Sequence, residues 1–177
     1  MSMPKKTKIN KKIGIVFWIE GFSGSGKSTL SSLIKDKINR LYGPTIILSG
    51  DVFRKFFKKT GYTKKDRILN SYKFSEVLNY LSRQKINIIY SVVGLNYKAK
   101  AIYKKKITNF VEIYLKTDIK KIIKLNKKKI YKNNNNILGI HIKPDYPKKP
   151  NIIIENNFDK PLKKVAAELI YKIKKII

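Results

Sequence analysis

The sequence predicts an α/β fold in which a parallel β-sheet is flanked by helices. Short apolar runs of strand length alternate along the chain with longer segments whose apolar residues recur at helical spacing. In addition, a glycine-rich segment connects the first apolar run directly to the first helical segment. With 177 residues, the chain is long enough for one globular domain.

The predicted strands are continuous runs rich in isoleucine, valine and aromatic residues. Such runs are typical of strands that are buried on both faces of a parallel sheet. They cover residues 13–20, 45–48, 86–93, 110–115 and 151–155.

The predicted helices lie between and after these strands. They cover residues 28–41, 51–59, 65–84, 97–106, 117 to about 126, and 161–177. The first helix carries Leu30, Ile34 and Ile38 on one stripe, as expected for a helix that packs on a sheet. Asp51 is expected to cap the second helix.

Residues 127–150 interrupt this alternation. They contain a lysine triplet, an asparagine run at 133–136 and three prolines, and they are too long for an ordinary connection. We expect a basic lid here, with a low-complexity insert over 132–136 as the alternative. Residues 1–12 are expected to form a flexible basic tail, and residues 13–177 a single domain.

The composition excludes several kinds of site. Lys and Arg number 41 against 11 Asp and Glu, a formal net charge of +30. Only four of the basic residues are arginine while isoleucine and asparagine abound, so we interpret the charge first as codon bias. The absence of cysteine excludes disulfides and thiolate sites, and the single histidine excludes a multi-histidine metal site. No run approaches a membrane span. We therefore expect a cytoplasmic protein without a membrane partner or a specific nucleic-acid partner.

The glycine-rich segment matches G-x-x-x-x-G-K-[ST] in full. Backbone N–H groups of such a loop surround phosphates, the lysine adds a point charge, and the hydroxyl ligates Mg²⁺. We therefore expect a three-layer P-loop NTPase fold with ATP and Mg²⁺ as cofactors, Lys27 as a catalytic residue and Ser28 as a metal ligand. The expected nucleotide-binding residues are Gly21, Phe22, Ser23, Gly24, Ser25, Gly26, Lys27, Ser28 and Thr29.

Polar residues after the second predicted strand suit an acceptor site. Asp51 and Arg54 stand at helical i, i+3 spacing, and Arg67 and Asn70 repeat that spacing. Ligands of open α/β sheets bind at the carboxyl ends of the strands. We expect Asp51 to assist an acceptor hydroxyl and to help hold Mg²⁺, and the planar guanidinium groups to bind phosphate or sulfate.

These segments together resemble the adenylyl-sulfate kinase family, which phosphorylates the 3′-hydroxyl of adenosine 5′-phosphosulfate with ATP. The resemblance is carried by residues 18–30, 50–54, 61–70, 110–114 and 128–131. It implies that Asp51 supports catalysis and Mg²⁺, that Arg54, Arg67 and Asn70 hold the acceptor nucleotide, and that Lys128 reaches the phosphates from the lid. Tyr146 is a candidate for stacking on the acceptor base. Members are often dimeric, so a homodimer is a further expectation.

The chain also departs from this family on the acceptor side and in the lid. Ser49 replaces an aspartate, residues 92–95 replace an aromatic-Ile-Ser-Pro turn, and Leu125 and Asn126 replace an arginine and an aspartate of the lid. A changed acceptor is therefore an alternative, namely cytidine diphosphoramidate in surface-polysaccharide modification. An alternative of another class is a nucleic-acid-binding ATPase or polynucleotide kinase that uses the positive charge.

Overall fold

The structure is a computed structural model that describes residues 6–57, 61–125 and 137–177. Within these residues, five strands form one sheet in the order β2-β3-β1-β4-β5, and every neighbouring pair is parallel. The strands are β1 (Val16–Glu20), β2 (Thr45–Ser49), β3 (Asn87–Val92), β4 (Phe110–Lys116) and β5 (Ile152–Glu155). The predicted α/β class with a parallel sheet is confirmed.

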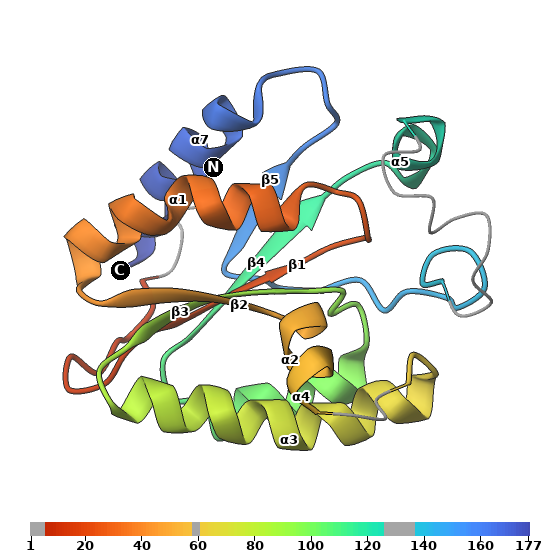
Figure 1. Ribbon diagram of the computed structural model, residues 1–177. Coiled ribbons are helices and arrows are strands. Elements are labelled where there is room, and N and C mark those ends of the chain that lie inside the picture. Colours follow the sequence, from red (N-terminus) through yellow and green to blue (C-terminus); the bar gives the residue numbers. More distant parts are fainter. Residues whose placement is uncertain (1–5, 58–60, 126–136) are drawn as a thin grey trace.

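Helices cover both faces of this sheet and complete three layers (Figure 1). On one face lie α1 (Lys27–Tyr42) and α7 (Leu162–Ile176), and on the other lie α3 (Lys64–Arg83) and α4 (Tyr97–Lys106). Two short helices, α2 (Gly50–Phe56) and α5 (Ile119–Leu125), lie near the end of the sheet to which the strands run. Within the described residues, no helix is long and apolar enough to cross a membrane.

The alternation of side chains along β1 divides the core into two parts. Phe17 and Ile19 pack with α1 and α7, whereas Val16 and Trp18 pack with the aromatic residues of α2, α3 and α4. All four side chains are buried, as expected for a central strand that is covered on both faces. Since β1 leads directly into the glycine-rich loop, this buried strand fixes where that loop begins.

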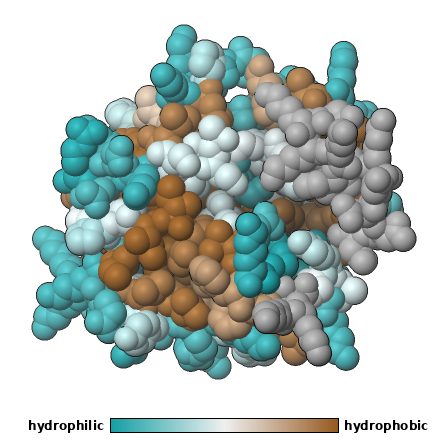
Figure 2. Space-filling model, in the orientation of Figure 1, coloured by the Kyte–Doolittle hydropathy of each residue, from teal (hydrophilic) through white to brown (hydrophobic). Residues whose placement is uncertain are grey.

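The edge strand β2 is less covered than the central strands. Its residues Ile46, Ile47 and Leu48 are half-buried, and none of its side chains is charged. Figure 2, in the orientation of Figure 1, shows an apolar area in the middle of the visible face of the molecule, surrounded by hydrophilic residues.

Residues 6–12, which belong to the predicted flexible basic tail, are hydrogen-bonded to the rest of the described chain, and the flexibility of the tail stays a prediction. The Thr7 backbone N–H donates to the Ile176 carbonyl at 2.7 Å, and the Asn10 N–H donates to the Asn109 side chain at 2.9 Å. Residues 1–5 lie outside the described residues. The first strand begins at Val16, later than predicted, and the Ile15 N–H donates to the side-chain oxygen of Asn87 on β3 instead of to a backbone carbonyl.

The prediction that Asp51 caps the second helix is wrong. Ser49 is the N-cap, and its side-chain oxygen accepts a hydrogen bond from the Val52 N–H at 3.2 Å. Asp51 therefore stands in the first helical turn, where its charge faces the positive end of the helix dipole. Because Ser49 performs the capping, the carboxylate of Asp51 is available for other contacts. The helix ends at Phe56, short of the predicted residue 59.

Candidate active site

The glycine-rich loop has a backbone that only glycine tolerates at several positions. Gly24 and Gly26 have φ angles of +78° and +97°, in the left-handed region. At Gly21 a Cβ atom would lie 2.6 Å from the Leu115 carbonyl oxygen, so a side chain there would collide with β4. These constraints explain the spacing of the predicted motif and show that the loop curls tightly between β1 and α1.

Lys27 begins α1 at the end of this loop. Its ammonium group donates to the Phe22 carbonyl at 2.5 Å, and the side chain is 8% exposed. Among the described residues, no side chain caps the helix N-terminus at Gly26, and Ser28 and Thr29 are exposed in the first turn. Both residues line the large cavity that is described below. The first-turn N–H groups and the positive end of the helix dipole suit an anion at this end of α1.

Asn156 supports the loop from the end of β5. Its side-chain amide donates to the Ser25 carbonyl at 2.8 Å, and Asn156 is almost completely buried. A Cβ atom on Gly26 would lie 3.0 Å from the same amide nitrogen. Sequence reasoning missed Asn156, since nothing in the spacing of the chain relates residue 156 to the motif.

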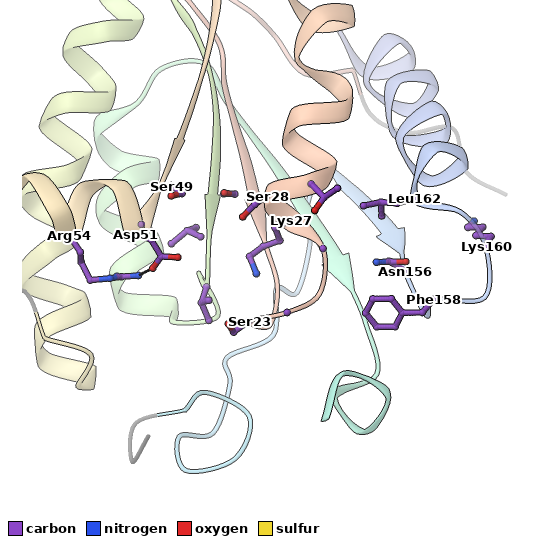
Figure 3. Close-up of a pocket in the computed structure, with 17 residues that line it drawn as sticks. Ser23, Lys27, Ser28, Ser49, Asp51, Arg54, Asn156, Phe158, Lys160 and Leu162 are labelled. Carbon is purple, nitrogen blue, oxygen red and sulfur yellow. Dashed lines mark hydrogen bonds and ion pairs between the residues drawn. The ribbon is translucent and has the colours of Figure 1, made fainter. Parts of the chain in front are cut away.

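A cavity of about 530 Å³, called here the large cavity, joins this loop to the predicted acceptor residues. Loop residues from Ser23 to Thr29 line one part of it, and residues from Ser49 to Arg54 line another. Figure 3 shows Lys27 between the Asp51–Arg54 pair on one side and Asn156 with Phe158 on the other. Wall residues that the sequence did not predict include Ser49, Ser91, Asn156, Phe158, Lys160 and Leu162.

Asp51 and Arg54 form an ion pair within α2. Arg54 Nη2 lies 2.5 Å from Asp51 Oδ1, and the side chains are 69% exposed for Asp51 and 20% for Arg54. The Arg54 guanidinium also lies over the ring of Tyr62, 4.5 Å from its centroid. Stacking and pairing together hold the guanidinium in one orientation beside an exposed carboxylate.

Arg67 and Asn70 come from α3 and meet Arg54 around a second cavity. This small cavity has a volume of about 40 Å³ and shares Gly50, Arg54, Val92 and Val93 with the wall of the large one. Burial and the neighbouring charge of Arg54 lower the pKa of Arg67, so the two guanidinium groups lie close together. Two like charges beside a cavity indicate a site that is suited to an anion.

Tyr146, which is predicted to stack on the acceptor base, is not among the described residues that line the two cavities. Tyr146 is 55% exposed and packs edge-on against Phe22, with 6.2 Å between ring centroids. Its neighbour Asp145 accepts a hydrogen bond from the Tyr97 N–H at 3.0 Å, which ties this segment to the start of α4. Lys128 lies outside the described residues.

A buried charge cluster lies directly behind the phosphate loop. The Lys100 ammonium group is 2.8 Å from Glu20 Oε1 and 2.6 Å from Glu112 Oε1, and Lys104 pairs with Glu112 from the surface. Glu20 is the last residue of β1 and is fully buried, so burial raises its pKa to about 8. The sequence showed these as isolated charges in apolar or lysine-rich segments, and only the fold brings them together.

The residues present fit a magnesium ion that arrives with a nucleotide. Among the residues that the structure describes, no group of three or more His, Cys, Asp or Glu side chains could hold a metal. However, the Ser28 hydroxyl and the Asp51 carboxylate both line the large cavity. One or two hard oxygen ligands from the protein suffice for Mg²⁺ when phosphates and water supply the rest.

The three-layer parallel sheet, with a phosphate loop between β1 and α1, defines the fold of a P-loop NTPase. The chain belongs to the adenylylsulphate kinase family, whose family model matches residues 13–155. Both the fold and the family that the sequence predicts are thereby confirmed.

Two relatives and one solved structure illustrate this membership. The chain is 30% identical over 161 residues to an adenylyl-sulfate kinase of Clostridium acetobutylicum, covering 87% of this chain and 80% of the relative. It is 26% identical over 162 residues to the cytidine diphosphoramidate kinase of Campylobacter jejuni, covering 89% of this chain and 94% of that relative. The Mycobacterium tuberculosis APS kinase CysC, solved in complex with AMPPNP and APS, has a TM-score of 0.82 at 22% identity, covering 92% of this chain and 98% of that chain.

Proposed function

We propose that this protein transfers the γ-phosphoryl group of ATP to the 3′-hydroxyl of adenosine 5′-phosphosulfate. The observation that carries the proposal is the continuous large cavity between the phosphate loop and the Asp51–Arg54 pair. A direct transfer requires donor and acceptor to lie side by side, and this cavity is bordered by both sets of residues.

The donor side of the reaction is assigned to the loop and the start of α1. Loop N–H groups and Lys27 bind the phosphates, and phosphate oxygens take the place of the Phe22 carbonyl as partner of the lysine. Mg²⁺, held by Ser28 and Asp51, would neutralise charge on the phosphates. The nucleoside of ATP extends along Phe158 and Leu162, on the side of the cavity opposite Asp51.

The acceptor side is assigned to α2 and α3. Asp51 accepts the proton of the 3′-hydroxyl while the oxygen forms a bond to the γ-phosphorus. The bond from that phosphorus to the β,γ-bridging oxygen breaks, and ADP leaves. Arg54, Arg67 and Asn70 hold the anionic tail of the acceptor. The contacts of Tyr146 with the acceptor base and of Lys128 with the phosphates stay predictions.

Cytidine diphosphoramidate is a second candidate acceptor. The observation in its favour is the similarity to the Campylobacter jejuni kinase along 94% of that protein. It also agrees with the sequence departures at Ser49 and residues 92–95, which lie on the acceptor side. Both candidates share a ribose hydroxyl and an anionic tail, so the same donor chemistry serves either.

A homodimer stays a prediction.

The test measures turnover of ATP by the purified protein in the presence of Mg²⁺. Each acceptor is offered separately, and the products are resolved by mass. We expect a product with one added phosphate on the adenosine acceptor. A product from the cytidine acceptor alone would overturn the proposed acceptor but keep the kinase assignment. No acceptor-dependent product from either would overturn the acceptor class.

Two variants separate the roles of donor and acceptor residues. Lys27→Ala should reduce turnover at least about a hundredfold, because it removes charge stabilisation of the transferring group. Asp51→Asn should reduce turnover while ATP still binds, since the amide cannot take the hydroxyl proton. Full activity in either variant would contradict these assignments.

A further inference from the structure

Glu20 and Glu112 are two buried carboxyl groups that lie against each other behind the phosphate loop. They are 0% and 2% exposed, and they are close enough to share a hydrogen bond. Because a carboxylate oxygen can only accept, a bond between two carboxyl groups exists only while one of them carries a proton. Within the described residues, the buried Glu20 Oε2 accepts no hydrogen bond from an N–H or O–H donor. The arrangement therefore provides a place for one proton between the two side chains.

The cations beside this pair favour Glu20 as the residue that carries the proton. Lys100 of α4 is shared by both carboxyl groups, at 2.8 Å from Glu20 and 2.6 Å from Glu112. Lys104 lies nearer the surface and pairs with Glu112 alone. Burial raises the pKa of Glu20 to about 8, whereas at Glu112 the hydrogen bonds outweigh burial and lower the pKa. Glu112 thus holds the negative charge that balances Lys100, and Glu20 ionises at higher pH.

The neighbouring strands bring one further titratable group to Glu20. Tyr114 lies beside it in the register of β4, and burial together with Tyr146 and Glu20 raises the pKa of Tyr114 to about 12. On the other side, the register of β3 places the uncharged Val92 next to Glu20. Lys100 keeps its charge, since the two carboxyl groups outweigh burial and raise its pKa. Glu20 is therefore the member of this group that changes its charge near pH 8.

The Glu20 carboxyl group also lies between two loops that border the site. Glu20 ends β1 and is bonded directly to Gly21, the first residue of the phosphate loop. A Cβ atom on Gly94 would lie 2.9 Å from Glu20 Oε2, so the carboxyl group also lies against the loop after β3. Gly94 lines the small cavity, and its neighbour Val93 lines both cavities. Because Glu20 is buried, water screens a charge on it poorly from either loop.

A negative charge on Glu20 and phosphates in the loop oppose each other. ATP brings several negative charges to the loop that directly follows Glu20, so bound ATP makes ionisation of Glu20 less favourable. The protein with ATP should then keep the proton to a higher pH than the protein without ATP. By linkage, the protonated protein binds ATP more tightly than the ionised protein by the same factor.

Building on the proposed function, which takes the phosphates of ATP to lie in the phosphate loop, we propose that the Glu20–Glu112 pair is a proton site coupled to nucleotide binding. Glu20 takes up a proton from solvent when ATP binds, and the protein loses ATP affinity when Glu20 ionises. Glu20 is then a positioning residue, since it acts through the loop and does not touch the nucleotide.

The experiment measures binding of ATP with Mg²⁺ by calorimetry between pH 7 and pH 9, without an acceptor. Repeating each titration in two buffers of different ionisation enthalpy counts the protons that are taken up. We expect an uptake of roughly half a proton per ATP near pH 8.5, and an affinity about fivefold lower at pH 9 than at pH 7. Glu20→Gln, which keeps the shape but cannot ionise, should abolish this uptake and bind ATP at pH 9 as tightly as at pH 7.

Two further variants keep the test decisive if Glu20→Gln does not fold. Glu112→Gln removes the like charge beside Glu20 and should move the loss of affinity to lower pH, because Glu20 then has Lys100 to itself. Glu76→Gln is the matched control. It removes an exposed carboxyl group of α3 that pairs with Lys106, and it should change neither the uptake nor the pH profile.

Three results would overturn the inference. The first is an ATP affinity of the wild-type protein that is independent of pH, without proton uptake. The second is an equal loss of affinity at every pH in Glu20→Gln, which is what a purely structural role would give. The third is a pH profile of Glu112→Gln that equals that of the wild-type protein.

These outcomes can be distinguished from failure of the proposed function. If ATP binds with coupled proton uptake but neither acceptor is phosphorylated, the proton site stands and the proposed reaction fails. If adenosine 5′-phosphosulfate is phosphorylated while proton uptake is the same in the wild type and in Glu20→Gln, the function stands and Glu20 is not coupled to ATP.

Discussion

Lys100 joins Glu20, the last residue before the phosphate loop, to Glu112 on the neighbouring strand. Its ammonium group lies 2.8 Å from one carboxylate and 2.6 Å from the other, and all three side chains are buried. The cluster thus links α4, β1 and β4 immediately behind the loop that binds phosphates. Buried ion pairs of this kind are sensitive to the loss of a single member.

Replacing Lys100 should destabilise the protein strongly. Lys100→Met leaves Glu112 with Lys104 as its cation and leaves the buried Glu20 side chain without a charged partner, which we expect to lower the free energy of unfolding by about 3 kcal/mol. Urea unfolding measures this change, and Lys98→Met, at an exposed position of the same helix, serves as the control. Equal stability of the two variants would show that the cluster contributes nothing to the fold.

The raised pKa of Glu20 predicts that stability falls as pH rises. Its ordinary value is 4.5 and the folded value is about 8, so between these pH values the folded chain binds one more proton than the unfolded chain. The free energy of unfolding should therefore decrease between about pH 5 and pH 8, by at most about 1.4 kcal/mol per pH unit, and level off above.

Glu20→Gln removes the carboxyl group that binds this proton, so its stability is compared with that of the wild-type protein. The pKa of Glu112 is lowered, because its hydrogen bonds outweigh its burial, and it therefore titrates below this range. Unfolding curves at several pH values should diverge between wild type and Glu20→Gln, and parallel curves would contradict the assignment.

Asn156 should matter for ATP binding even though it lies far from the motif in sequence. Asn156→Ala leaves the Ser25 carbonyl without its 2.8 Å hydrogen bond and loosens the loop. We expect ATP affinity to fall about tenfold, as measured by nucleotide titration. Asn157→Ala is the matched control, because Asn157 bonds to the Asp118 N–H instead of the loop. If both variants bind ATP equally, the support from β5 is not functional.

Gly94 should resist even a small side chain. A Cβ atom there would lie 2.7 Å from Trp18 Cζ2 and 2.9 Å from Glu20 Oε2. Gly94→Ala should therefore lower the free energy of unfolding by about 1–3 kcal/mol. Part of that loss should be recovered when Glu20→Ala is added, which a double-mutant cycle measures as coupling. Strict additivity would mean that Glu20 does not restrict this position.

The sequence alone indicated much of the fold and the donor half of the site. The buried character of β1 and the motif from Gly21 to Ser28 are local properties, because they depend on runs of apolar residues and on glycines that allow positive φ angles. The pairing of Asp51 with Arg54 also follows from i, i+3 spacing within one helix. The same spacing singled out Arg67 and Asn70, and the family resemblance then implied that they hold the acceptor nucleotide.

Only the tertiary structure decided the contacts that join distant parts of the chain. Asn156 reaches Ser25, and Lys100 reaches Glu20, across 131 and 80 positions respectively, so no periodicity in the sequence relates them. The small cavity likewise combines Trp18 of β1, Tyr90 of β3 and Arg67 of α3. Whether a polar atom is buried without a partner depends on every neighbour that the fold brings to it, and this is why the sequence could not show these groups.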